Sequence, residues 1–267
     1  MFSTQACIFA FAIIGYVAAG VLYAKQFFSH SNKLAKYAQL SLMLGLISHL
    51  GLLILQTSNS NGEQLSLSFV TAMLAWLVTL TIFITHKFIK NLLFIPVVCF
   101  VSALFISIDM LVPATTGITV NMSLPMILHI LLSLMAFGVL SISTLYACQL
   151  AYINYQLKHK KRIMLSGTLP PLMAVENILY KLMTYGSILL FVALATGFIF
   201  VENMLADGYG HKTVLSSLSL VCFVACIVLH KIFGLRARVA ITLNIIGLSL
   251  LALGYFGSRL VKELLLN

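Results

Sequence analysis

The sequence predicts an all-α protein, a polytopic transmembrane helix bundle of about eight spans with both termini outside. Three observations predict this fold class. Of the 267 residues, 61% are hydrophobic and only 8% are charged, whereas about a quarter of a typical soluble domain is charged. Eight apolar runs approach the roughly 20 residues that cross a bilayer. Basic residues gather in every second connection. We therefore expect residues 1–267 to form a single integral-membrane domain within a lipid bilayer.

The eight predicted spans are joined by connections too short to hold a soluble domain. Their approximate limits are Ala6 to Ala24, Leu34 to Gln56, Leu67 to Thr85, Leu92 to Leu111, Leu124 to Leu157, Ile178 to Val201, Val214 to Leu235 and Val239 to Leu260. The first run lacks the basic start and the small-residue cleavage site of a secretory signal. We expect it to remain as a span.

The basic residues predict the orientation of the bundle. Thirteen of the sixteen lysines and arginines lie in or beside the connections that follow odd-numbered spans: Lys25, Lys33, Lys36, Lys87, Lys90, Lys158, Lys160, Lys161, Arg162, Lys181, Lys231, Arg236 and Arg238. Connections rich in lysine and arginine stay in the cytoplasm. We therefore expect a multi-pass protein of a bacterial inner (plasma) membrane, with both termini on its outer side.

Several classes of function lack the residues they need. The net charge of +10 follows the topology of the loops, so we expect no nucleic-acid partner. All five cysteines lie in apolar runs without a C-x-x-C pair, which excludes a thioredoxin-like redox site. The sequence has no phosphate-binding loop, no G-x-S-x-G, no H-E-x-x-H and no paired carboxylates on one face. We expect no enzymatic activity and name no catalytic residue.

Histidines inside the membrane carry the chemistry that remains. His49 lies about seven residues from the outer end of the second span, and His129 lies about five residues from the outer end of the fifth. Two imidazoles at matched depth suit the two axial positions of a haem iron. Small residues precede or follow each histidine at helical spacing, which favours close helix packing. An intramembrane histidine can equally form an ordinary hydrogen bond across helices, and both interpretations remain open.

The other notable polar and aromatic residues favour simpler roles. Cys222, Cys226 and His230 share one face of the seventh span, which is compatible with a metal site but favours helix packing. We expect Asp109 to be a local cap or ion partner, and Trp76 to pack or to face lipid. The histidines at span ends or in loops are expected to be solvated: His30, His86, His159 and His211.

Several stretches, in order along the chain, resemble the CcsA-type cytochrome c assembly proteins. The histidine-bearing helix is similar over LHILLSLMAFG at 128–138 and LYACQLAYINYQL at 145–157. Further similarity lies in LPPLMAVEN at 169–177, in HKIFGLRAR at 230–238 with Asn244, and in GYFGSR at 254–259. The resemblance covers nearly the whole chain.

The resemblance implies a haem-binding membrane protein of cytochrome c biogenesis, with non-covalent b-type haem as cofactor and other cytochrome assembly proteins as partners. It implies that His129, His49 and His230 are ligands of the haem iron. His129 matches the family's externally placed histidine, and His230 matches its transmembrane histidine before a basic loop. The tryptophan-rich WWD loop and the external histidine after the last span are missing. We therefore expect haem handling or delivery without attachment of haem to the cytochrome.

Two other classes of function remain as alternatives. A small-solute transporter or exporter would use the histidines to line a polar path, although no pair of interrupted spans marks a transport site. A non-catalytic scaffold would dock with other components of a membrane assembly complex.

Overall fold

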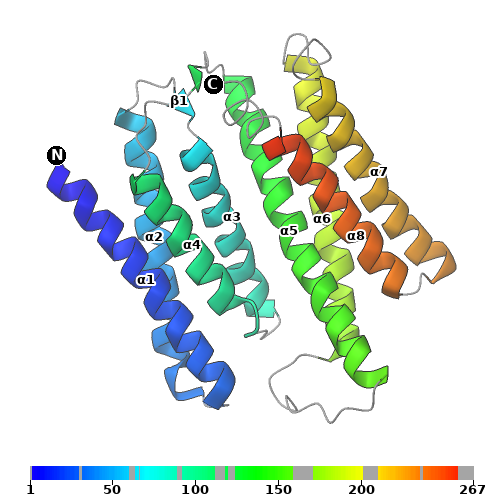
Figure 1. Cartoon of the computed structure of the whole chain (residues 1–267), viewed down its shortest axis with the longest axis horizontal. Helices are drawn as coiled ribbons and strands as arrows, with labels where there is room; N and C mark the ends of the chain where they lie inside the picture. Colours follow the sequence, from blue (N-terminus) through cyan, green and yellow to red (C-terminus); the bar gives the residue numbers. More distant parts are fainter. Residues whose placement is uncertain are drawn as a thin grey trace. The chain divides into compact units, whose positions relative to one another are not determined.

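A computed structural model of the chain describes residues 2–29, 32–59, 64–65, 67–88, 92–111, 118–119, 124–158, 171–200, 210–234 and 237–257. Long helices make up almost all of this part (Figure 1). The chain divides into two compact units. Residues 1–122 with 164–170 form the first unit, and residues 123–163 with 171–267 form the second.

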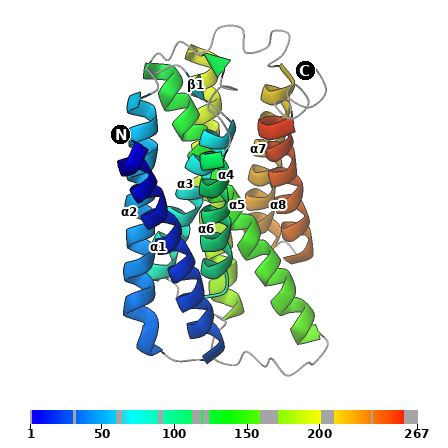
Figure 2. The ribbon, with the colours of Figure 1, turned by 60° about the vertical axis from the view of Figure 1, so that its left-hand side comes forward.

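The described part of the first unit holds four long helices and a short strand pair (Figure 2, blue to green). The elements are α1 (Phe2–Ser29), the 3-10 helix η1 (Asn32–Leu34), α2 (Ala35–Asn59), β1 (Gln64–Leu65), α3 (Leu67–Phe88), α4 (Ile95–Leu111) and β2 (Ile118–Thr119). Strands β1 and β2 pair antiparallel. Helix α1 packs against α2 and α4, and α3 packs against the same two helices, so the four helices form a closed ring.

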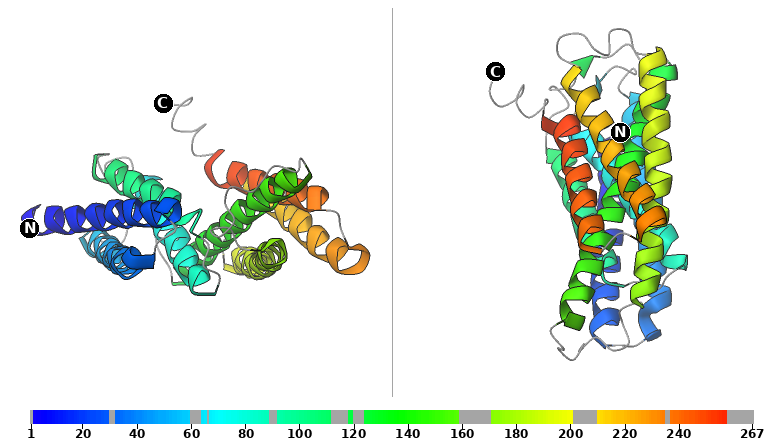
Figure 3. Two further views of the ribbon diagram at one scale, coloured as in Figure 1. Left: turned by 90° about the horizontal axis from the view of Figure 1, so that it is seen from below. Right: turned by 90° about the vertical axis from the view of Figure 1, so that its right-hand side faces the viewer.

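In the second unit, the residues that the structure describes also form four long helices (Figure 3, green to red). The elements are α5 (Leu124–Lys158), α6 (Leu172–Phe200), α7 (Gly210–Phe233), α8 (Ala237–Ala252) and the π-helical turn η3 (Leu253–Gly257). Each helix packs against the next one in sequence, and α8 packs back against α5. This unit is therefore a second ring of four helices.

The predicted all-α membrane fold is confirmed. Among the described residues, seven helices are long and apolar enough to cross a bilayer: α1, α2, α3, α5, α6, α7, and α8 with the first part of η3. Helix α4 is also apolar but shorter, at 17 residues. The single domain expected for residues 1–267 and the outer position of both termini stay predictions.

The ends of the helices differ from the ends of the predicted spans, because local backbone hydrogen bonds decide where a helix begins and ends. Helix α6 begins at Leu172 and not at Ile178, because the Pro171 carbonyl accepts hydrogen bonds from the amides of Ala174 and Val175 at 2.9 and 3.1 Å. Proline suits a helix start, since its missing N–H needs no partner there. Helix α7 ends at Phe233 and not at Leu235, because the next residue, Gly234, has a positive φ of 60° and its amide donates to the His230 carbonyl at 3.0 Å, which closes the last turn.

Glycines bring the first two helices into backbone contact. A Cβ atom on Gly15 of α1 would lie 2.7 Å from the backbone nitrogen of Gly45 on α2. The Tyr16 ring packs directly on Gly45, because a Cβ there would lie 2.8 Å from the ring. The predicted small-residue face of α2, which continues to His49, therefore packs closely against α1.

A buried amide joins α5 to α8 inside the second unit. Asn244 is fully buried. Its side-chain nitrogen donates to the Ser143 hydroxyl at 2.9 Å, and its oxygen accepts from the Thr144 hydroxyl at 2.6 Å. Both groups of the amide are thus satisfied inside an apolar interior, where an unpaired polar group would be costly.

Candidate functional site

His129 presents the clearest ligand geometry among the described histidines. It lies near the start of α5 and is half-buried. Its Nδ1 atom is 2.8 Å from the carbonyl oxygen of Ala193 on α6. Because a carbonyl can only accept, Nδ1 must carry the proton, and Nε2 keeps its lone pair. Histidines that bind metals commonly show this arrangement, with the non-binding ring N–H donated to a carbonyl.

Two neighbouring hydroxyl groups lie close to His129, one near its ring and one at its backbone carbonyl. The Thr196 hydroxyl donates to the same Ala193 carbonyl at 2.9 Å and lies 3.4 Å from the His129 Nδ1 atom. The Ser133 hydroxyl donates to the His129 carbonyl at 2.8 Å. These bonds use polar groups of α5 and α6 themselves, so the histidine does not depend on solvent for its orientation.

His49 is buried in the first unit with one ring nitrogen unused. Only 1% of its surface is exposed. Nδ1 is 3.1 Å from the hydroxyl of Tyr16 on α1, and the two rings meet edge to face at 5.7 Å. Nε2 is buried and has no hydrogen-bond partner among the described residues. A buried ring nitrogen without a partner is costly, so Nε2 is the atom of His49 whose polar requirement the described residues leave unmet.

Further polar groups lie near Tyr16 inside the first unit. The hydroxyl of Thr79 on α3 lies beside Tyr16 and shares a hydrogen bond of 2.7 Å with the Ser102 hydroxyl on α4. Trp76 packs against the cluster of Leu53, Phe69 and Ala72. Its indole N–H donates to the Leu46 carbonyl at 2.9 Å. Trp76 is thus packed, which is one of the two roles expected for it.

The His230 ring is stacked on a tyrosine ring of the neighbouring helix. Its ring lies parallel to that of Tyr180 on α6, with centroids 3.6 Å apart and an interplanar angle of 16°. Nδ1 of His230 and the hydroxyl of Tyr180 are both buried without a hydrogen-bond partner among the described residues. Ligation through Nε2 would therefore leave a buried Nδ1–H without an acceptor. His230 fits an iron ligand less well than His129 does.

The three predicted ligands do not all lie in one unit. His49 belongs to the first unit, and His129 and His230 belong to the second. Their service as haem ligands, and the pairing of His49 with His129 at matched depth, stay predictions. In the part of the chain that the structure describes, three or more His, Cys, Asp or Glu side chains never cluster as a metal site would need. Cys226 is buried, with its thiol directed at the Ala240 carbonyl at 3.7 Å, as the packing interpretation expects.

The expectations for Asp109 and for the histidines at span ends or in loops have different outcomes. His86 is not simply solvated: it is half-buried, and its ring meets that of Tyr23 edge to face at 5.7 Å. His211 is exposed, as expected. Asp109 accepts a hydrogen bond from the Gln56 side-chain amide at 2.6 Å. His30 and His159 lie outside the described residues.

Tyr16, Tyr180 and Ala193 are the site residues that the sequence did not single out. Tyr16 and Tyr180 carried a usable signal, since a tyrosine within an apolar span needs a polar neighbour for its hydroxyl. Ala193 carried none, because it contributes only a backbone carbonyl.

Comparisons with known proteins place the chain among membrane proteins of one family. The profile of the family described as "Cytochrome C assembly protein" matches residues 34–266. The "Inner membrane protein YpjD" of Escherichia coli strain K12 is 29% identical over 257 residues, covering 95% of this chain and 97% of that protein. An "Uncharacterized 28.8 kDa protein in nifR3-like 5'region" of Azospirillum brasilense is 30% identical over 142 residues, covering 52% of each chain. No solved structure matches the chain significantly.

Proposed function

Because the chain belongs to the cytochrome c assembly protein family, we propose that it binds haem in the bacterial inner membrane and handles or delivers that haem during cytochrome c biogenesis. The membrane location rests on its helices and on the printed name of its Escherichia coli relative. Other cytochrome assembly proteins are the partners that such a role requires.

The His129 hydrogen bond is the observation that supports haem binding most directly. The Ala193 carbonyl fixes the proton on Nδ1 and so leaves Nε2 as a lone-pair donor. The buried Nε2 of His49 is a second ring nitrogen without a hydrogen-bond partner among the described residues. The residues present therefore fit a haem iron.

His129, His49 and His230 are the candidate ligands of non-covalent b-type haem, and one haem iron would take at most two of them. The bound haem supplies the iron chemistry, while the protein sets its ligands and access. His129 is oriented through Ala193, His49 through Tyr16, and His230 through the Tyr180 ring. Residues 202–213 contain no tryptophan. We therefore propose transfer or storage of haem and not its covalent attachment.

Absorption spectroscopy of the detergent-purified protein tests this proposal. We expect a Soret band from the wild type, either as purified or after titration with haemin. His129→Ala should reduce haem uptake at least tenfold, because it removes an oriented ligand. His211→Ala is the matched control, since His211 is an exposed histidine of the same unit. Wild-type protein that shows no haem band and takes up no haemin would overturn the proposal.

A further inference from the structure

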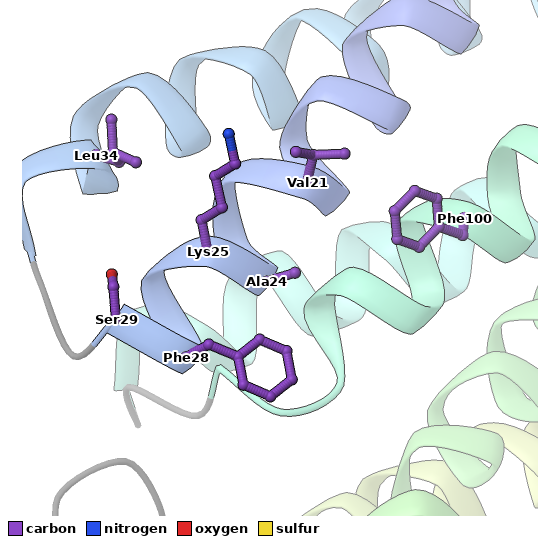
Figure 4. A pocket seen from close by; sticks show the side chains of 7 residues that line it. All are labelled: Val21, Ala24, Lys25, Phe28, Ser29, Leu34 and Phe100. Carbon is purple, nitrogen blue, oxygen red and sulfur yellow. The ribbon is translucent and has the colours of Figure 1, made fainter.

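An open groove lies beside the last turns of α1 in the first unit (Figure 4). It is shallow and open to its surroundings, with a volume of about 590 Å³. Val21, Ala24 and Phe28 come from α1, Leu34 from η1, and Phe100 from α4. The groove is thus built by three elements of one unit.

The walls of the groove are apolar side chains that remain open to the surroundings. Phe28 is 80% exposed, Phe100 is 43% exposed and Val21 is 39% exposed. Phe100 is held in place by Gly20, where a Cβ atom would lie 3.0 Å from the tip of its ring. In a membrane-spanning helix bundle, such an exposed apolar surface faces lipid acyl chains.

Lys25 gives the same groove a positive charge. Its side chain stands between Leu34 and Val21, while Phe28 and Phe100 flank Ala24 (Figure 4). Lys25 is exposed and forms no ion pair with any described residue. Asp109, the described acid of this unit, is engaged by Gln56 near the end of α4. The charge of Lys25 is therefore left for a ligand.

We infer that this groove binds an anionic phospholipid. The ammonium of Lys25 pairs with the headgroup, and Val21, Phe28 and Phe100 contact the upper acyl chain. A lysine at the end of a span places its charge at the membrane–water interface, where lipid phosphates lie. A phospholipid matches both parts of the groove, the apolar wall with its acyl chain and the unpaired cation with its headgroup. A free anion would match only the cation, and a plain hydrocarbon would match only the wall.

Quenching of a tryptophan placed in the groove measures which lipid occupies it. Phe28→Trp in a Trp76→Phe background carries its single tryptophan at the groove. We would reconstitute this protein with brominated phosphatidylglycerol or brominated phosphatidylcholine and compare the quenching. We expect phosphatidylglycerol to be preferred about fivefold, the equivalent of roughly 1 kcal/mol for one basic side chain near an anionic surface. Adding Lys25→Ala should bring the preference close to one.

Lys36→Ala is the matched control, because Lys36 is exposed near the start of α2 but does not line the groove. It should keep the preference for phosphatidylglycerol. Phospholipid that co-purifies with otherwise unsubstituted protein provides a second measure: Lys25→Ala should lower its anionic share, and Lys36→Ala should not. Equal quenching by the two lipids, or a preference that survives Lys25→Ala, would overturn the inference. Haem binding plays no part in either measurement.

Discussion

The two best-oriented histidines depend on different kinds of partner. His129 donates its ring proton to a backbone carbonyl, which a conservative side-chain substitution at Ala193 would leave in place. His49 instead forms a hydrogen bond with the side-chain hydroxyl of Tyr16. Substitution of that tyrosine by phenylalanine removes the hydroxyl oxygen and nothing else. The orientation of His49 can therefore be tested by chemistry at a neighbour without touching the histidine itself.

Tyr16→Phe should destabilise the protein by about 1–3 kcal/mol, the cost of leaving a buried polar group without its partner. The aromatic ring stays, so its packing on Gly45 is kept. Thermal unfolding in detergent, followed by loss of helical signal, measures the effect. Tyr185→Phe is the control, because Tyr185 is 62% exposed and its loss of a hydroxyl should change little. Equal stability of the two variants would show that the Tyr16–His49 bond contributes nothing.

The positions of the candidate ligands could be predicted from the sequence, but their hydrogen bonds could not. His49, His129 and His230 stood out because histidine is costly within an apolar span. The partner of His49 lies 33 positions away in sequence, and that of His129 lies 64 positions away. Which helix faces meet decides these pairs, and a single sequence does not contain that information directly.

At the scale of elements, contact between α1 and α2 depends on two glycines. A methyl group on Gly15 would come within 2.8 Å of both the nitrogen and the Cα atom of Gly45. Backbone atoms cannot rotate away as a side chain can, so the helices would have to separate. Such separation would also move Tyr16 relative to His49.

Gly15→Ala should therefore destabilise the protein by about 1–3 kcal/mol, as overpacking does in tight interiors. Gly51→Ala in α2 is the matched control, because a Cβ there meets nothing within 4 Å. Alanine is the better helix former, so this control should be neutral or up to about 1 kcal/mol more stable. Unfolding midpoints in one detergent compare the two variants. A Gly15→Ala protein as stable as the control would contradict the close approach of α1 and α2.

The sequence predicted which elements exist better than it predicted where they end. Apolar runs locate spans because the bilayer demands them, but a helix continues wherever its backbone can still hydrogen-bond. Helix α1 thus extends beyond the predicted Ala24 to Ser29, and α2 extends beyond Gln56 to Asn59. The extension of α1 adds Phe28 to the groove, which the predicted span did not include.

At the scale of the whole molecule, the positions of the lysines along the helices bear on which side of the membrane each helix end faces. The described lysines of the first unit are Lys25, Lys33, Lys36 and Lys87. They lie near the end of α1, in η1, near the start of α2 and near the end of α3. Successive helices that cross a membrane bring these positions to one side of it. Asp109 lies near the opposite end, at the close of α4. These lysines are among those from which the orientation was predicted, so the orientation stays a prediction.

Reporter fusions test that orientation directly. Alkaline phosphatase fused after residue 267 should be active, because the enzyme matures only outside the cytoplasm, and green fluorescent protein fused there should stay dark. After Lys158, at the end of α5, the two reporters should behave in the opposite way. The physical reason is that lysine-rich connections resist transfer across the membrane. Fluorescence at the C-terminus together with phosphatase activity after Lys158 would invert the topology. It would then place the Lys25 groove on the outer side and the start of α5, with His129, on the cytoplasmic side.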